Sequence, residues 1–164
     1  MNYKPFDKKE YERNDERAKK AGQIFLRQKG CMPVRETQEF YKLKDFSVIY
    51  KGEDIPVEVE IKNMWKSSFK WLGYSTVSIP TRKNQSKSTL YLLFNDRMDT
   101  LLYCPTSEVL SSTIIKKNTS KGTVLEPFFD SPLSKWRMEA LINGVWSEVT
   151  NFGGVSLQEI LIGK

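Results

Sequence analysis

Residues 45–62 read DFSVIYKGEDIPVEVEIK and carry the clearest periodic pattern in the chain. In their second half, β-branched side chains alternate with charged ones, which places Glu58, Glu60 and Lys62 on one side. A period of two residues is typical of a β-strand with one buried face. The preceding run, residues 46–50, is also rich in strand-forming residues. The pattern therefore predicts a β-hairpin around which the rest of the chain is organised.

The turn of this hairpin is expected at Gly52, because glycine readily adopts the positive φ that the first central position of a type II′ turn requires. With the turn centred between residues 52 and 53, residue 45 pairs with residue 60. Directly opposed residues have Cβ atoms about 4.5–5.5 Å apart. The spacing thus predicts that Asp45 and Glu60 face each other, with Lys62 two residues further on the same face.

Two carboxylates at that separation repel each other unless a cation lies between them. Mg²⁺ and Mn²⁺ prefer oxygen ligands, and Mg²⁺ commonly binds one or two carboxylates together with substrate phosphate. A lysine alongside can orient a metal-bound water or stabilise charge on phosphate oxygens. Asp45, Glu60 and Lys62 are therefore the candidate catalytic residues, and Asp45 and Glu60 the candidate ligands of Mg²⁺ or Mn²⁺. The alternative is a solvated strand face with ordinary surface charges.

An aspartate, a spacer and then Glu-x-Lys on the next strand resembles the PD-(D/E)XK nuclease superfamily. The expected order of helix, strand and acidic hairpin over residues 10–65 is similar to the opening of that nuclease core. The resemblance implies an α/β (α+β) fold with a restriction-endonuclease-like core. In such a fold, a mixed central β-sheet carries an N-terminal helix and a further flanking helix. The resemblance also implies that the backbone carbonyl of Ile61 completes the metal site. Glu58, on the same face of the strand as Glu60, is a further candidate ligand.

Residues 8–29 have the apolar periodicity of an amphipathic helix, and Gly30 is suited to end it. Proteins of the PD-(D/E)XK superfamily often bring an acidic residue from the first helix to the metal. The resemblance therefore makes Glu12 and Glu16 candidates for that role, with a solvated helix face as the alternative.

The tail contains Gly-Val-Ser-Leu at residues 154–157, where Ser156 can cap a short helix. This tail is similar to that of archaeal-type Holliday junction resolvases, which have the same nuclease fold. The similarity implies an endonuclease that selects branched or junction DNA. The chain departs from those enzymes in its longer C-terminal half and in Glu58, where an apolar residue is more usual.

The absence of histidine excludes several kinds of chemistry. Serine-histidine hydrolysis, cysteine-histidine proteolysis and histidine-ligated zinc or haem all require that side chain. Cys31 and Cys104 are too few for a disulfide framework or a zinc knuckle, so a reducing cytoplasm and two buried thiols are expected. The 164 residues are expected to form one nuclease-like domain, with residues 1–8 frayed and the core motifs within residues 10–105.

The net charge of +6 and the pI near 9.2 are typical of a protein with a polyanionic partner. DNA is the expected partner, RNA is not excluded, and no apolar run approaches the 18 or more residues of a membrane span. Nucleases of this type often act as dimers, which makes a homodimer an expectation of the resemblance. The candidate phosphate contacts are Lys66, Lys70, Arg82, Lys83 and Lys87.

Aromatic residues and lysines alternate after the hairpin, in the sequence NMWKSSFKWLGYS. Trp65, Phe69 and Trp71 are suited to stack on bases, and the alternative is a short helix or loop that buries Trp65, Phe69 and Leu72. Beyond this segment, a helix is expected at residues 106–110 and a surface loop at residues 111–122. Strands are expected at residues 31–43, 77–80, 89–94, 100–104, 124–129, 136–142 and 145–149.

Three functions follow from these patterns. The first is a Mg²⁺-dependent endonuclease that hydrolyses phosphodiester bonds in DNA. The second is a catalytically inactive nucleic-acid-binding module with the same fold, in which Glu60 and Lys62 merely form an ion pair. The third is a structural or assembly protein without a nucleic-acid partner.

Overall fold

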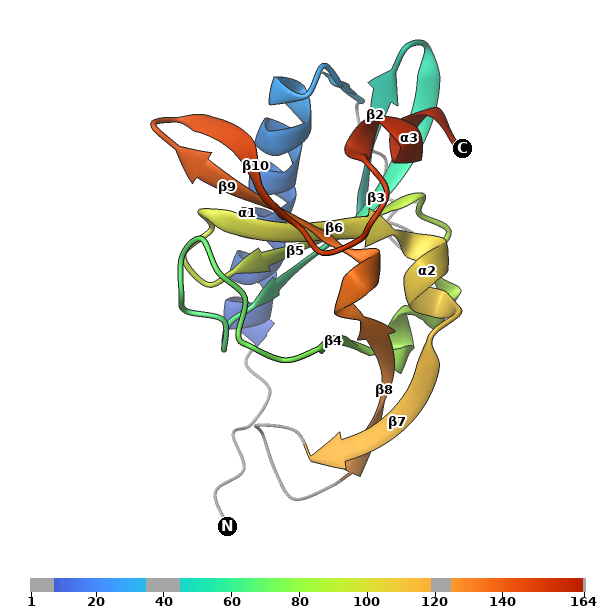
Figure 1. Ribbon diagram of the computed structural model, residues 1–164. Coiled ribbons are helices and arrows are strands. Elements are labelled where there is room, and N and C mark those ends of the chain that lie inside the picture. The colour runs from blue at the N-terminus through green and yellow to red at the C-terminus, as the bar shows by residue number, and fades with distance from the viewer. Residues whose placement is uncertain (1–7, 35–44, 119–124, 164) are drawn as a thin grey trace.

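The computed structural model describes residues 8–34, 45–118 and 125–163, without the side chains of residues 8–13 and 85 (Figure 1). Within these residues, the chain forms a seven-stranded sheet of order β1-β2-β3-β5-β6-β9-β10 and a three-stranded sheet of order β4-β8-β7. The strands of the larger sheet are β1 (Met32–Pro33), β2 (Phe46–Tyr50), β3 (Glu53–Lys62), β5 (Leu90–Asn95), β6 (Thr100–Pro105), β9 (Arg137–Ile142) and β10 (Val145–Asn151). Those of the smaller sheet are β4 (Thr76–Pro80), β7 (Thr113–Asn118) and β8 (Leu125–Pro132).

The larger sheet is mixed, because β3 runs parallel to β5 while its other strand pairs are antiparallel. The helices are α1 (Lys8–Gln28), α2 (Thr106–Leu110) and α3 (Leu157–Ile162), with short 3₁₀ segments η2 (Thr81–Gln85) and η3 (Leu133–Lys135). The fold is therefore mixed α/β with a mixed sheet and few helices. None of the described helices combines the length and the apolar character that a bilayer crossing requires.

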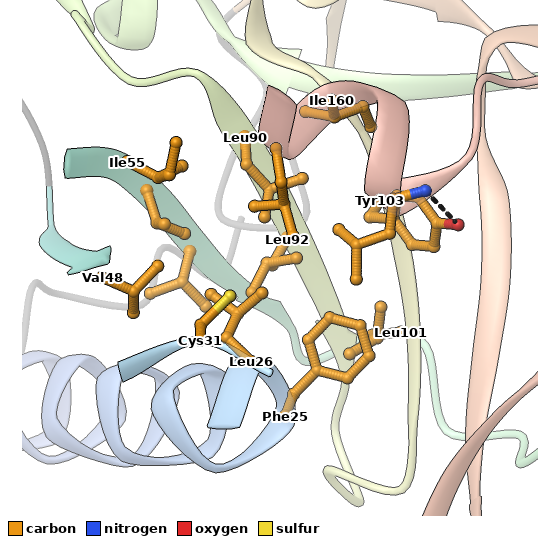
Figure 2. Packing of buried hydrophobic residues seen from close by; sticks show 14 of the residues in the cluster. Phe25, Leu26, Cys31, Val48, Ile55, Leu90, Leu92, Leu101, Tyr103 and Ile160 are labelled. Atoms are coloured by element: carbon orange, nitrogen blue, oxygen red, sulfur yellow. Dashed lines mark hydrogen bonds between the residues drawn. The ribbon is translucent and has the colours of Figure 1, made fainter. Parts of the chain in front are cut away.

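Helix α1 covers one face of the larger sheet. Phe25 and Leu26 are fully buried, and Figure 2 shows both side chains pointing toward residues of the central strands such as Leu92 and Leu101. The same core is closed by α3, whose Leu157 donates its backbone N–H to the Tyr103 hydroxyl at 3.2 Å (Figure 2). The tail thus packs against the core on the α1 side of the sheet.

A second core lies on the opposite face of the sheet. Trp65, Tyr91 and Trp136 are fully buried there, and Tyr91 and Trp136 meet edge to face with ring centroids 6.1 Å apart. Strand β5 is consequently buried along its whole length, as its continuous apolar sequence predicts. Strand β3 differs from the half-buried strand that its alternation predicts, because its polar face is also covered and Glu58 is only 6 % exposed.

The hairpin of β2 and β3 has a different turn from the predicted one. Lys51 and Gly52 both have positive φ, at 50° and 84°, which is the pattern of a type I′ turn. Phe46 consequently lies opposite Val57, a register two residues away from the predicted one. The prediction that Asp45 faces Glu60 is therefore wrong. The predicted face of each β3 side chain was nevertheless correct, because a register shift of two residues leaves every side chain on the same face of the sheet.

Several other elements match their predictions. The helix predicted at 8–29, the β5–β6 hairpin, the helix at 106–110 and the Asn143-Gly144 hairpin are all present. The loop predicted at 111–122 is wrong in its first half, because residues 113–118 form strand β7 against β8. Of the strand predicted at 31–43, residues 31–34 are described and Met32–Pro33 form β1, whereas residues 35–43 lie outside the described residues.

Both cysteines are buried and unpaired, as expected. Burial raises the pKa of Cys31 to about 11 and raises the pKa of Cys104 well above its usual value. Neither thiol is therefore in the reactive thiolate form at neutral pH.

Candidate functional site

The candidate site lies on the face of β3 that points away from α1. Val57 and Val59 pack into the core beneath α1, so the alternation of the strand turns Glu58, Glu60 and Lys62 to the other side. Segment η2 covers that side, and its side chains approach the two glutamates. The three charged residues that the sequence grouped on one face are thus gathered under η2.

Asp45 lies beside Glu58 at the edge of the sheet, one residue before β2. Its backbone N–H donates to the Val57 carbonyl at 3.0 Å, and its Oδ2 accepts the Val59 N–H at 2.8 Å. Backbone and side chain together therefore bracket Glu58. Burial raises the pKa of Asp45, although Lys83 and the Val59 N–H lower it. We call Asp45, Glu58 and Glu60 the acidic cluster.

Lys83 of η2 forms a buried ion pair with Glu58. Its Nζ lies 2.6 Å from Glu58 Oε1, and the two side chains are only 15 % and 8 % exposed. Burial raises the pKa of Glu58, and Asp45 and Glu60 raise it further, while Lys83 opposes them. Burial acts to lower the pKa of Lys83, but the three carboxylates outweigh it, and the pKa is raised. The ammonium of Lys83 therefore acts as the counter-ion of the whole acidic cluster.

Glu60 is held from two sides. The Tyr91 hydroxyl donates to Glu60 Oε2 at 2.8 Å, and Nη2 of Arg82 lies 3.9 Å from Oε1. Burial raises the pKa of Tyr91 well above its usual value, and the charge of Glu60 adds to this, so the phenol keeps its proton and remains a donor. One oxygen of Glu60 is thus fixed, while the other lies 3.9 Å from the exposed guanidinium of Arg82.

Lys62 stands at the end of β3 next to this carboxylate. Burial lowers the pKa of Lys62, with Glu60 opposing and Lys117 of β7 adding to the decrease. Among the described residues, its ammonium has no salt bridge within 4.0 Å and no hydrogen bond. Lys62 is therefore free to donate to a bound group.

The remaining predicted ligands are placed less directly. Glu16 is exposed on α1 and lines, together with Asp45, a hollow of about 520 Å³ whose lining residues do not include Glu58 or Glu60. The carbonyl of Ile61 points to the same edge as that of Val57, because alternate residues of a strand present their carbonyls to the same side. This edge is the one where Asp45 lies.

The predicted phosphate contacts separate into buried and exposed groups. Lys83 belongs to the buried group, and its ammonium forms an ion pair with Glu58. Lys66 is 69 % exposed but pairs with Asp96 at 3.0 Å, while Lys70 and Lys87 are exposed. Arg82 is 60 % exposed and lies at the margin of the acidic cluster.

The acidic cluster holds a cation, and that cation is the Lys83 ammonium. No group of three or more Asp, Glu, Cys or His side chains in the described ranges is arranged to hold a metal ion. The donor set still suits a hard divalent ion, because it consists of carboxylate oxygens that share one buried counter-charge. As the structure stands, Lys83 is the counter-ion of these carboxylates, so a metal ion would have to displace its ammonium.

Sequence reasoning missed one residue of the site, Tyr91, and one pairing, that of Lys83 with Glu58. Tyr91 was assigned to the core, and its hydroxyl in an otherwise apolar run was the only indication of a polar partner. The pairing of Lys83 with Glu58 joins residues 25 positions apart and left no pattern in the sequence.

Comparison of the chain with protein-family models, with curated proteins and with solved structures found no significant match.

Proposed function

We propose that this protein is a metal-dependent endonuclease that hydrolyses phosphodiester bonds in DNA. The observation that carries the proposal is the acidic cluster, in which three carboxylates share one buried ammonium beside the unengaged Lys62. The order of α1, β1 and the β2–β3 hairpin supports it, since the PD-(D/E)XK resemblance implies a helix, a strand and an acidic hairpin in that order.

Glu58, Glu60 and Asp45, with the carbonyl of Ile61, are the groups that would hold Mg²⁺ or Mn²⁺. When bound, the ion supplies a lowered pKa for a coordinated water and neutralises charge on the scissile phosphate. Tyr91 fixes one oxygen of Glu60 by its hydrogen bond and so orients that carboxylate. Lys83 would have to give up its place in the acidic cluster to such an ion.

Lys62 contributes a hydrogen-bond donor at the same place. Its ammonium can bind a phosphate oxygen without leaving another partner, because it makes no ion pair with the described residues. Arg82 and Lys117 add positive charge around it, and the net charge of +6 favours a polyanion. The proposal names DNA without selecting branched forms, since the tail that resembles the junction resolvases packs against Tyr103 on the other face of the sheet.

The test is incubation of the purified protein with linear, circular and branched DNA, with Mg²⁺, Mn²⁺ or EDTA. We expect metal-dependent cleavage that Glu60→Gln and Lys62→Ala each reduce by about 100-fold or more. Glu126→Gln and Lys135→Ala, at exposed positions outside the site, serve as matched controls and should cleave like the wild type. Undiminished cleavage by both site variants would overturn the assignment.

A second candidate function is a nucleic-acid-binding module without catalysis. The specific observation in its favour is the Lys83–Glu58 pair, which already neutralises the acidic cluster. This candidate predicts salt-dependent DNA binding that is the same with Mg²⁺ and with EDTA, and no cleavage under either condition.

A further inference from the structure

A second hollow, of about 310 Å³, lies outside the acidic cluster. Its wall includes Phe69, Trp71, Tyr74 and Phe152, with Lys70 as the charged side chain among its lining residues. Sites for small organic groups begin at about this volume and are usually lined by apolar and aromatic side chains with few polar groups. We call it the aromatic hollow.

The aromatic hollow is joined to the candidate site through the chain. Residues 63–75 connect β3 to β4, and Trp65 donates its backbone N–H to the Lys62 carbonyl at 3.0 Å. The segment that carries Phe69 and Tyr74 therefore starts at the last residue of the candidate site. It forms no helix, so of the predicted alternative, a short helix or loop that buries Trp65, Phe69 and Leu72, the loop is present and Trp65 is buried, whereas Phe69 is exposed.

Two of the rings are exposed to solvent. Phe69 is 51 % exposed and Tyr74 is 62 % exposed, whereas Trp71 is 9 % exposed and meets Trp65 edge to face at 4.9 Å. The indole N–H groups of both tryptophans are bonded to backbone carbonyls, at 2.8 Å for Trp65 and 3.0 Å for Trp71. The floor of the hollow is thus rigid, while the exposed rings at its rim lack a protein partner for much of their surface.

Phe69 is held in an unusual conformation. Its φ of 65° lies in the left-handed region, which bulky residues rarely adopt. Its N–H donates to the hydroxyl of Thr100 at 2.9 Å, and Ser68 next to it donates to Asp99 at 2.6 Å. Asn95, which is fully buried, donates to the Ser67 carbonyl at 3.1 Å. These bonds fix a bend that presents the Phe69 ring to solvent.

We infer that the aromatic hollow binds the base of an unpaired nucleotide. The base stacks on the rings of Phe69 and Tyr74, and Lys70 contacts the adjacent phosphate. Every base has a π-face, and stacking on aromatic side chains with a cation for the backbone is the way in which proteins hold single strands. The charge suits this occupant, since no acidic residue lines the hollow. The inference rests on the proposed function, because both require that the protein binds a nucleic acid.

The test measures binding by fluorescence anisotropy in EDTA, so that it does not depend on cleavage. The probes are a labelled oligodeoxythymidylate of 12 nucleotides, an abasic strand of the same length, and a DNA duplex. We expect Phe69→Ala and Tyr74→Ala each to weaken binding of the oligodeoxythymidylate by about fivefold or more. Neither variant should change affinity for the abasic strand or the duplex.

Two controls separate stacking from folding. Met64→Ala removes a side chain that is 60 % exposed in the same segment but does not line the hollow, and should bind like the wild type. Phe69→Gly suits the left-handed conformation and should keep the thermal unfolding midpoint while it loses binding. Equal affinity of the wild type for the thymidylate and the abasic strand, or wild-type binding by both ring variants, would overturn the inference. Metal-dependent cleavage can survive either result, so the two proposals fail separately.

Discussion

Glu58 is an anion in a place where water reaches little of it. A carboxylate that is 8 % exposed loses most of its hydration, and an unpaired charge in such a place is strongly unfavourable. Lys83 Nζ, at 2.6 Å, partly compensates for this, because it lowers the pKa of Glu58 against the effect of burial, and Glu58 in turn raises the pKa of Lys83. The Lys83–Glu58 ion pair therefore stabilises the folded state, and a metal ion that binds Glu58 would have to break it.

Loss of Lys83 should therefore destabilise the protein. Lys83→Met leaves the acidic cluster without its counter-ion, and we expect the free energy of unfolding to fall by about 3 kcal/mol. Urea denaturation at pH 7 measures it. Adding Glu58→Gln to this variant should recover part of the loss, because the double variant no longer buries that charge. A loss below about 1 kcal/mol, the value of an exposed pair, would contradict the account.

Glu139 provides a pH-dependent test away from the candidate site. It is 4 % exposed, and Lys29 Nζ lies 2.8 Å from its Oε1. The two groups form an ion pair, but their geometry is not that of a hydrogen bond to Oε1. Burial raises the pKa of Glu139, and Lys29 only partly opposes this. The folded state therefore favours the protonated form more than the unfolded state does. The resulting stability is complete below the ordinary pKa and is lost as the pH rises through the raised pKa.

Glu139→Gln mimics the protonated form at every pH. The free energy of unfolding of the wild type should fall relative to that of the variant between about pH 4 and neutrality, and urea denaturation across this range measures the difference. A difference that moves in the opposite direction would mean that Lys29 outweighs burial.

At the scale of elements, the strands and faces of the β2–β3 hairpin were predictable from the sequence, but the register between the two strands was not. Alternation fixed the strand and its faces, so the prediction that Glu58, Glu60 and Lys62 share a face is correct. The register depends on whether Lys51 or Gly52 starts the turn. The structure places Lys51 at φ 50°, a conformation that its residue type does not indicate.

Strand β7 was missed for a related reason. Residues 113–118 are mostly polar and exposed, and they become a strand only through pairing with β8. The Asn143-Gly144 turn was predictable, because both residues take the positive φ that a tight hairpin turn requires. Local sequence therefore predicted the elements whose residue types are required by a special backbone conformation or by burial. It failed for β7, which forms a strand only because it pairs with β8.

The crossing of residues 153–154 over η3 gives a test at this scale. A Cβ on Gly153 would lie 2.5 Å from the Ser134 carbonyl oxygen, and its φ of 128° also disfavours a side chain. We expect Gly153→Ala to lower the free energy of unfolding by about 2 kcal/mol or more, measured by urea denaturation. Gly144→Ala is the matched control, because Gly144 has φ 79° with open space around it and should cost about 1 kcal/mol or less. Equal losses in both variants would show that the close approach contributes nothing.

At the scale of the molecule, the larger sheet divides two tasks. One face packs against α1 and α3 and contains the core of Figure 2, and the other face carries the second core and the acidic cluster. The acidic cluster comes from the residue before β2 and from β3, while Lys83 reaches it from η2 and Tyr91 from β5. Sequence reasoning found Asp45, Glu58 and Glu60, because they lie close together in the sequence, at and within the β2–β3 hairpin. It did not find Lys83 and Tyr91 as their partners, because only the completed fold brings η2 and β5 to that face.

Titration with Mn²⁺ tests the central claim, that a divalent ion takes the place of the Lys83 ammonium. Calorimetry should give one Mn²⁺ per wild-type chain, at least about tenfold tighter binding to Lys83→Met, and at least about tenfold weaker binding to Asp45→Asn and Glu58→Gln. Glu126→Gln should bind like the wild type, and circular dichroism confirms that each variant is folded. The account predicts that Mn²⁺ raises the thermal unfolding midpoint of Lys83→Met more than that of the wild type. Absence of saturable Mn²⁺ binding to both the wild type and folded Lys83→Met would contradict it.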